Sequence, residues 1–188
     1  EVVAFTGSVP VGKKIAATAG YKKLVLELGG NDPLIVLEDA DLNLAVTLAA
    51  EGSYRNSGQR CTAVKRILVQ ESIAEAFTQA LVERTREYVC GNPFDEATKV
   101  GTVIDEASAR SLEAVVHEAV AQGARVLIGG ERKGALLQPT VIDRVPRDCR
   151  MVVCESFGPL APIVTVRDLD DALTLANSTA YGLSSGVV

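Results

Sequence analysis

A layered α/β domain with a mostly parallel sheet is the fold that this 188-residue sequence predicts. Short apolar runs typical of strands alternate along the chain with segments whose apolar residues recur at helical spacing. Some helical segments follow a capping residue, as at Asp41 and Ser72. Strands that alternate with helices in this way join into parallel sheets, and a chain of this length holds one domain or slightly more.

The first quarter of the chain predicts a strand, a helix and two more strands. The turn Thr6-Gly7-Ser8 separates the first strand from the helix, and Gly20 ends that helix. The next two strands are apolar runs bounded by Gly29-Gly30 and by acidic residues. The expected bounds are 2–5 for the first strand, 11–19 for the helix, and 23–28 and 33–37 for the later strands.

The remaining elements repeat the alternation. Helices are expected after the cap residues Asp41 and Ser72, from Asp105 to Gly123, and over 168–177. The third of these turns its apolar residues inward: Leu112, Val115, Val116 and Ala119. Strands are expected over 64–69, 126–128, 139–142 and 163–166, and an exposed turn over 129–134.

The composition excludes several classes of protein. Apolar residues make up 47% and charged residues 23%, which is globular rather than disordered. The net charge of −5 and the scattered basic residues argue against nucleic-acid binding. No apolar run approaches the ~20 residues of a membrane-spanning helix, and no signal peptide is apparent. We expect no nucleic-acid or membrane partner and a cytoplasmic location.

Both ends of the chain are strand-like, which predicts a piece of a larger protein. The chain starts with Glu1-Val2-Val3-Ala4-Phe5, without Met or a helix cap, and ends with Ser185-Gly186-Val187-Val188. A trimmed protein whose disordered ends are left out is the alternative.

The four cysteines do not predict a metal site or a disulfide framework. Zinc sites need clustered ligands at short spacing, and the chain has no CxxC pair and a single histidine, His117. Three of the thiols receive no role and are expected to be structural or incidental: Cys90, Cys149 and Cys154.

Two glycine-rich segments near the N-terminus could carry chemistry. Gly7 and Ser8, followed by Gly12, lie at the start of the first helix, where free N–H groups favour an anion such as a pyrophosphate. Glu27 precedes Leu28-Gly29-Gly30 in an apolar strand, and burial there would raise the pKa of a carboxyl and make it a usable general base. Taken singly, each segment is more often structural.

The strongest single feature is Cys61. It lies in Asn56-Ser57-Gly58-Gln59-Arg60-Cys61-Thr62, where a glycine-containing loop and a neighbouring cation suit a reactive thiol. A later segment, Glu155-Ser156-Phe157-Gly158-Pro159, combines an acid, an aromatic and a rigid turn, and Asn177 with Tyr181-Gly182-Leu183 follows it.

Taken in order and with their spacing, these five segments resemble the NAD(P)-dependent aldehyde dehydrogenase superfamily over essentially the whole chain. The resemblance implies a three-layer α/β/α catalytic domain over residues 31–188, truncated at its C-terminal end. It also implies that residues 1–30 are the C-terminal remnant of a Rossmann-like cofactor domain. A small aldehyde substrate, an NAD or NADP cofactor and a homodimer or homotetramer are implied for the full-length protein.

The resemblance also assigns roles to individual residues. It makes Cys61 the nucleophile that forms a thiohemiacetal and then a thioester, with its own backbone N–H as an oxyanion donor. Glu27 becomes the base that activates water, which favours release of a free acid over transfer to coenzyme A. The residues expected to contact the cofactor are Gly7, Ser8, Gly12, Leu28, Gly29, Glu155 and Phe157.

Arg60 gives an indication of the kind of substrate. A guanidinium beside the nucleophile suits a phosphoryl or carboxylate group, with Thr62 as a further substrate contact. The string from Ser57 to Arg66 resembles the branch with non-phosphorylating glyceraldehyde-3-phosphate dehydrogenase and phosphonoacetaldehyde dehydrogenase, and the string from Glu27 to Val36 leans toward the latter. A semialdehyde or uncharged aldehyde is the alternative, with Arg60 turned away and paired with an acid.

Two other readings stay open from the sequence alone. The 188-residue piece could be a folded but inactive scaffold, because most of the implied cofactor site lies outside it. A cysteine hydrolase using Cys61 with His117 is the second, although His117 falls in an ordinary amphipathic helical pattern, where a surface or packing role is expected.

Overall fold

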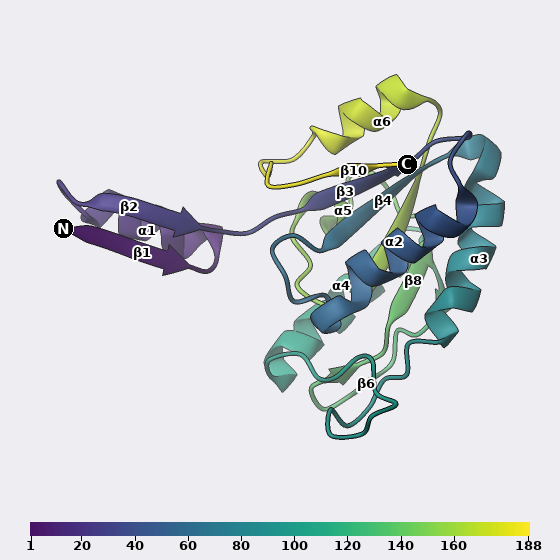
Figure 1. Cartoon of the computed structure of the whole chain (residues 1–188), viewed down its shortest axis with the longest axis horizontal. Coiled ribbons are helices and arrows are strands. Elements are labelled where there is room, and N and C mark those ends of the chain that lie inside the picture. The colour runs from purple at the N-terminus through teal and green to yellow at the C-terminus, as the bar shows by residue number, and fades with distance from the viewer.

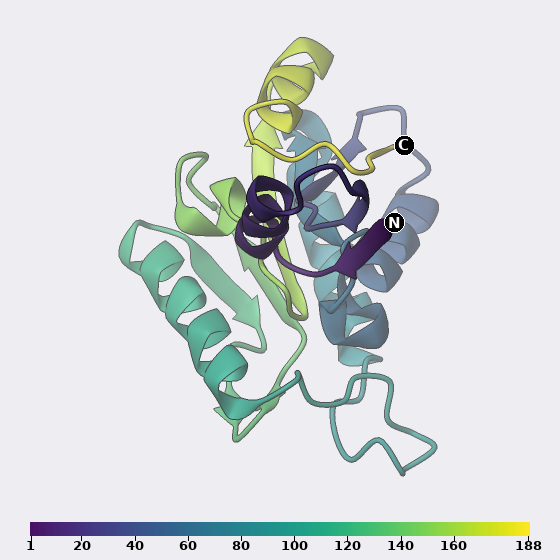
Figure 2. The ribbon, with the colours of Figure 1, turned by 90° about the vertical axis from the view of Figure 1, so that its left-hand side faces the viewer.

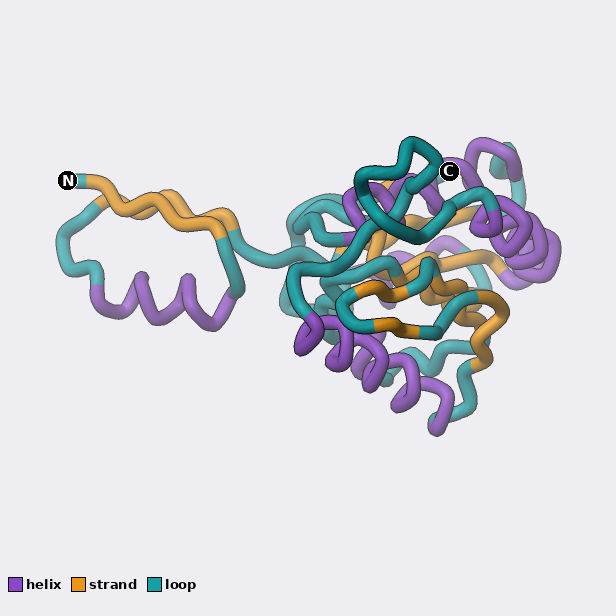
Figure 3. Tube along the Cα trace, turned by 90° about the horizontal axis from the view of Figure 1, so that it is seen from below, coloured by secondary structure: helices purple, strands orange, loops and turns teal.

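The computed structural model describes residues 1–188 and divides them into an arm and a body. In the arm, a two-stranded parallel sheet pairs β1 (Val2–Thr6) with β2 (Lys23–Glu27), and α1 (Val9–Thr18) connects them. Figures 1 and 3 show the arm projecting from the body, joined to it by one extended segment. Most arm residues are exposed or half-buried, and only Gly12 and Ala19 are buried.

The body is built on a six-stranded sheet of order β10-β3-β4-β9-β8-β5. Every pairing is parallel except that of β5 with β8. The mostly parallel α/β sheet expected from the sequence is therefore confirmed. The strands are β3 (Asp32–Val36), β4 (Val64–Gln70), β5 (Arg125–Ile128), β8 (Thr140–Asp143), β9 (Leu160–Val166) and β10 (Gly186–Val187).

Helices cover both faces of this sheet, as Figure 2 shows. Side chains alternate between the faces: Leu34 and Val36 belong to one buried cluster, and Ile35 to the other. The first cluster includes residues of α2 (Leu42–Tyr54) and α3 (Ala74–Arg86). The second includes residues of α4 (Glu106–Ala121), α5 (Arg150–Val153) and α6 (Leu169–Ala176). A parallel sheet buried on both faces explains why its strands place apolar residues on both faces.

Short elements complete the chain. Two 3₁₀ turns, η1 (Arg55–Gly58) and η2 (Glu71–Ile73), follow α2 and β4, and a hairpin pairs β6 (Arg132–Lys133) with β7 (Leu136–Leu137). No helix of the chain is both long and apolar enough to cross a membrane.

The structure corrects the expected elements in a few places. Asp41, Asp105 and Asp168 accept hydrogen bonds from backbone N–H groups of the helices they precede. Ser72 does not act as a cap: it lies inside η2, and its hydroxyl donates to Glu38 instead. The segment 129–134, expected as an exposed turn, contains the first strand of the hairpin, and α5 and β7 were not expected. These elements are two to four residues long, too short to show a periodic pattern.

Candidate active site

The Cys61 loop leaves α2 through an unusual backbone. Asn56, Ser57 and Gly58 have φ angles of 55°, 55° and 68°, all in the left-handed region that side chains disfavour. Only glycine fits at position 58, because a Cβ there would collide with the Gly158 carbonyl oxygen and lie 2.8 Å from Ser53 O. The loop carrying the thiol therefore packs backbone to backbone against the segment that contains Glu155 and Phe157.

Side chains beside the thiol hold this loop in place. The Gln59 amide donates to Thr102 O at 3.3 Å and accepts from the Ile104 N–H at 2.8 Å. Ser57 Oγ donates to Gly101 O at 3.1 Å. Cys61 itself is a half-buried free thiol, and its backbone N–H takes part in no hydrogen bond. A constrained loop thus presents a thiol and an uncommitted N–H donor.

The connection from the arm to the body passes beside this thiol. The Gly30 N–H donates to Glu155 Oε1 at 3.1 Å, and a Cβ on Gly30 would meet the Cys61 carbonyl oxygen. A Cβ on Gly29 would meet the Glu155 carboxylate, and one on Gly12 would meet the Leu28 side chain. The structure therefore brings together Leu28, Gly29, Cys61 and Glu155, although 125 positions separate Gly30 from Glu155.

Two pockets lie on either side of the loop. One, of about 350 Å³, includes Gln59, Cys154, Glu155 and Phe157 in its lining. The other, of about 330 Å³, includes Arg60 and Thr62. Gln59 lines one pocket and its neighbour Arg60 lines the other, so the loop that carries Cys61 borders both, although Cys61 itself is not among the lining residues of either. A larger groove, of about 870 Å³, lies away from this loop between α3 and the β5–β8 side of the sheet.

Arg60 forms no ion pair. Its Nη2 donates to Gly52 O at 2.9 Å, near the end of α2, and its Nε is buried without a partner. The expectation that a structural Arg60 would pair with an acid is not met. Asp32 and Glu51 also line the pocket, but the Asp32 carboxylate accepts hydrogen bonds from Ser184 Oγ and N.

The other residues expected to take part in the site, Glu27, Ser8 and Gly7, lie in the arm. Glu27 ends β2, and within these 188 residues its carboxylate is exposed at the end of the strand. Ser8 precedes α1, and its hydroxyl makes no capping hydrogen bond. Gly7 accompanies it, with its N–H donated to Glu27 O at 3.0 Å.

The remaining thiols and the histidine lie in other surroundings. Burial raises the pKa of the Cys90 and Cys149 thiols, which opposes reactivity. Cys154 is exposed beside Glu155. His117 is on the exposed face of α4 and makes no hydrogen bond to Cys61, so the structure gives the cysteine–histidine reading no support.

One residue near the thiol received no role from the sequence. Lys65, in β4, is 1% exposed, and its Nζ donates to Gly58 O at 2.8 Å. Burial lowers its pKa to about 8. A lysine and an arginine inside the otherwise apolar run Val64–Gln70 are the signal that could have drawn attention to it.

Comparison with known proteins agrees with this arrangement. The profile of the aldehyde dehydrogenase family matches residues 1–188. A lactaldehyde dehydrogenase of Methanococcus maripaludis is 41% identical over 187 residues, which cover 100% of this chain and 40% of that protein. A sulfoacetaldehyde dehydrogenase of Neptuniibacter caesariensis is 40% identical, over 100% of this chain and 41% of its own.

A solved structure shows the same fold. The glyceraldehyde-3-phosphate dehydrogenase GapN of Methanocaldococcus jannaschii, complexed with NADP, superimposes with a TM-score of 0.96 at 43% identity. The match covers 100% of this chain and 41% of that one. The chain thus spans about 40% of the length of these relatives.

Proposed function

The chain belongs to the aldehyde dehydrogenase family, and from this premise we propose that the full-length protein carrying it oxidises an aldehyde to the carboxylic acid with NAD(P)⁺. The observation that carries the proposal is the constrained Cys61 loop between two pockets. One pocket holds Glu155 and Phe157, and the other holds Arg60 and Thr62. A loop that carries the proposed nucleophile and borders two separate pockets suits a reaction that joins a cofactor and a second substrate.

Cys61 is the proposed nucleophile. Its sulfur would attack the aldehyde carbon and form a carbon–sulfur bond, while its free backbone N–H would stabilise the negative oxygen of the thiohemiacetal. The nicotinamide, when bound, supplies the acceptor for the hydride that leaves this carbon. Cys61 is then left carrying a thioester, and addition of water releases the acid and restores the thiol.

Glu27 is the proposed base for that water. It ends β2, directly before the Leu28–Gly30 connection that runs beside Cys61. Its exposed carboxylate has no hydrogen-bond partner in the chain, so it is free to accept a proton. A base here favours hydrolysis over transfer of the acyl group to coenzyme A.

The residues present fit a dinucleotide. The first turn of α1 offers N–H groups and the positive end of a helix dipole, and the Ser8 hydroxyl is uncommitted. Gly7 and Gly12 add no side chain at this turn. Glu155 and half-exposed Phe157 line the pocket that a ribose and a nicotinamide would occupy beside Gly29. NAD and NADP are both compatible with these residues.

For the substrate, we propose an aldehyde with an anionic group, such as a phosphonate, phosphate or sulfonate. Only Nη2 of Arg60 is committed, to carbonyl oxygens, and no acid neutralises the guanidinium. Arg55 and Thr62 line the same pocket. A fixed cation next to the nucleophile would orient an anionic tail by charge-assisted hydrogen bonds. A semialdehyde carboxylate would satisfy the same chemistry, whereas an uncharged aldehyde would not use it.

The test compares substrates in the full-length protein. Cofactor reduction would be followed with phosphonoacetaldehyde, glyceraldehyde 3-phosphate, sulfoacetaldehyde and an uncharged aldehyde of similar size. Arg60→Leu should lower kcat/KM for anionic substrates by about 10- to 100-fold, the equivalent of one charge-assisted hydrogen bond. It should leave the uncharged substrate nearly unchanged.

The matched control is Arg110→Leu, which removes the same charge from an exposed ion pair with Glu106 on α4. A similar loss for all four aldehydes would make Arg60 structural and remove the anionic reading. Failure of the wild type to oxidise any of them, or full activity in Cys61→Ala, would contradict the dehydrogenase itself.

Two further proposals concern the chain as a part. We expect the isolated 188 residues to be a folded but inactive unit that shows no tight binding of NAD or NADP, because the arm supplies only part of a cofactor site. Residues 1–30 would belong to the cofactor domain and residues 31–188 to the catalytic domain. The full-length protein would be a homodimer or homotetramer.

A further inference from the structure

Lys65 occupies an irregular position in the sheet. Asp32 on β3 pairs with Val64, but the next residue, Pro33, pairs with Arg66, so Lys65 is skipped by the ladder. Pro33 has no N–H to donate, which suits a break in the pairing. Bulges of this kind re-aim a side chain, and they recur next to active sites.

The re-aimed side chain joins two segments of the active site. Lys65 Nζ donates to the carbonyl of Gly58, three residues before the thiol, at 2.8 Å. The same atom lies 4.8 Å from the centroid of the Phe157 ring. One ammonium therefore contacts both the nucleophile loop and the turn that faces the proposed cofactor pocket.

The charges around Lys65 come from every segment packed against it. Glu155 precedes β9, Asp32 begins β3, and Arg60 and Cys61 belong to the loop. Burial lowers the pKa of Lys65 to about 8, and the two carboxylates oppose that effect. Near pH 8 the group is therefore divided between its charged and neutral forms.

Arg66, the next residue, is a buried cation with a structural role and serves as a comparison for Lys65. It is equally buried, at 1% exposed. Its guanidinium donates to Asn31 O, Leu175 O and Ala176 O at 2.8, 3.0 and 2.9 Å, and the last two of these carbonyls belong to α6. Arg66 ties α6 to the sheet, whereas Lys65 has one carbonyl partner and one aromatic face.

We propose that Lys65 is a positioning residue whose charged ammonium holds the Cys61 loop against the Phe157 turn, so that the thiol is correctly presented only while Lys65 is protonated. As a role in the reaction it rests on the proposed function.

The test measures alkylation of Cys61 by iodoacetamide against pH in the full-length protein, with the modified peptide identified by mass spectrometry. Wild type should show two ionisations, one of them near pH 8, with the rate limited once Lys65 is neutral. Lys65→Met should lose that step and react about tenfold more slowly at pH 7. Lys65→Arg keeps its charge above pH 8. It should therefore restore the rate of alkylation at pH 7 and show no ionisation near pH 8.

Controls separate positioning from folding. Lys65→Met keeps the side-chain volume and leaves only the Gly58 carbonyl without its donor, so its melting temperature should fall less than that of Arg66→Met, which leaves three carbonyls without theirs. Arg66→Met should lower the melting temperature but retain the two ionisations. If Lys65→Met reacted at the wild-type rate with the wild-type pH profile, the proposal would be wrong.

Activity distinguishes this inference from the proposed function. Lys65→Met should lower kcat for the aldehyde with little change in KM, whereas alkylation needs neither aldehyde nor cofactor. If wild type oxidised no aldehyde but alkylation still depended on Lys65, the reaction would be wrong and the positioning right. If wild type oxidised the aldehyde normally, but neither alkylation nor kcat depended on Lys65, the proposed reaction would be right and the positioning role wrong.

Discussion

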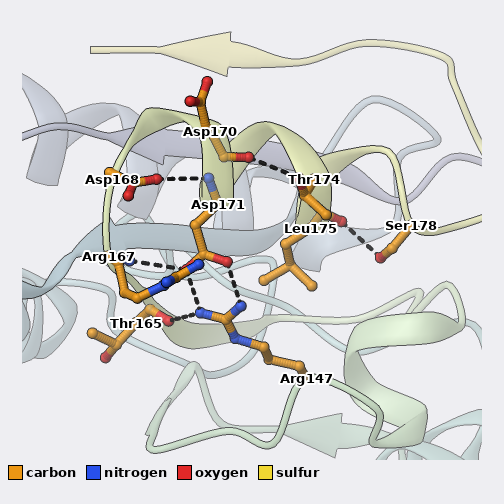
Figure 4. A network of polar contacts seen from close by, with 9 residues as sticks. All are labelled: Arg147, Thr165, Arg167, Asp168, Asp170, Asp171, Thr174, Leu175 and Ser178. Atoms are coloured by element: carbon orange, nitrogen blue, oxygen red, sulfur yellow. Dashed lines mark hydrogen bonds and ion pairs between the residues drawn. The ribbon is translucent and has the colours of Figure 1, made fainter.

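The polar groups around α6 are paired with one another, whereas polar groups of the Cys61 loop are left without a partner. In the network, Asp171 accepts from Arg147 Nη1 and Nη2 at 2.6 and 2.7 Å and from the Arg167 N–H at 2.9 Å, as Figure 4 shows. Asp168 caps the helix by accepting from the Asp171 N–H at 2.8 Å.

The loop leaves polar groups open and strains its backbone. Three consecutive residues have positive φ, Arg60 Nε is buried without a partner, and the Cys61 N–H is uncommitted. Strain and unsatisfied groups cost stability, and they persist only where the surrounding structure imposes them. The network around α6 therefore contributes to the stability of the fold. The Cys61 loop lowers that stability, and in return it is held in a geometry that suits a reactive thiol.

The largest expected effect comes from breaking the loop. Gly58→Ala would force a Cβ against the Gly158 carbonyl at a φ of 68°. We expect a loss of about 2–4 kcal/mol in unfolding free energy, from the positive φ and the collision together. A thiol displaced by ~1 Å should also lose at least ~100-fold in activity.

Gly134→Ala is the matched control, because Gly134 has a φ of 60° and nothing within 4 Å of its Cβ position. It should cost about 1 kcal/mol in chemical denaturation and leave activity unchanged. Equal effects of the two substitutions would mean that the contact between the loop and Gly158 is unimportant.

An intermediate effect is expected from breaking the network. Arg147→Leu leaves the Asp171 carboxylate, 7% exposed, without its main partner, at a cost of about 1–3 kcal/mol near pH 7. The cost stays moderate because the Arg147 side chain is 45% exposed, so water screens its interaction with Asp171. Arg86→Leu, which breaks an exposed pair with Glu83, should cost less than ~0.5 kcal/mol.

The pH dependence gives the sign of this effect. Hydrogen bonds from Arg147 hold the pKa of Asp171 below its ordinary value. The carboxylate therefore stabilises the fold above pH ~4, and this contribution is lost as the pH falls through the folded-state pKa. Denaturation curves of wild type and Arg147→Leu should converge in acid. A constant difference from pH 7 to pH 2 would contradict the assignment.

The smallest expected effect is the loss of one helix cap within the same network. Asp168→Ala removes the acceptor for the Asp171 N–H and should cost about 1 kcal/mol. Asp170→Ala removes the same charge from the same turn, but the Asp170 side chain accepts no such hydrogen bond. We therefore expect the unfolding free energy to change by only about 0.3 kcal/mol. Activity should be unchanged in both, which thermal denaturation with a parallel rate assay would check.

The sequence by itself determined most of the fold. Continuous apolar runs in β3 and β4 require burial on both faces, and Asp41, Asp105 and Asp168 begin their helices through bonds to residues two or three positions away. Such signals are local, so they can be recognised along the chain. The separate segments that carry Gly29, Cys61 and Glu155 were also identified, because each is a short motif whose own residues lie within a few positions of one another.

Only the tertiary structure decided how those residues meet. The bond from Gly30 to Glu155 spans 125 positions, and the contact of Gly58 with Gly158 spans a hundred. Burial is equally non-local: Lys65 is buried because a bulge in a six-stranded sheet turns it toward Gly58. The surroundings of a charged side chain depend on segments distant in the chain, so its pKa and its partners emerge only when the chain is folded.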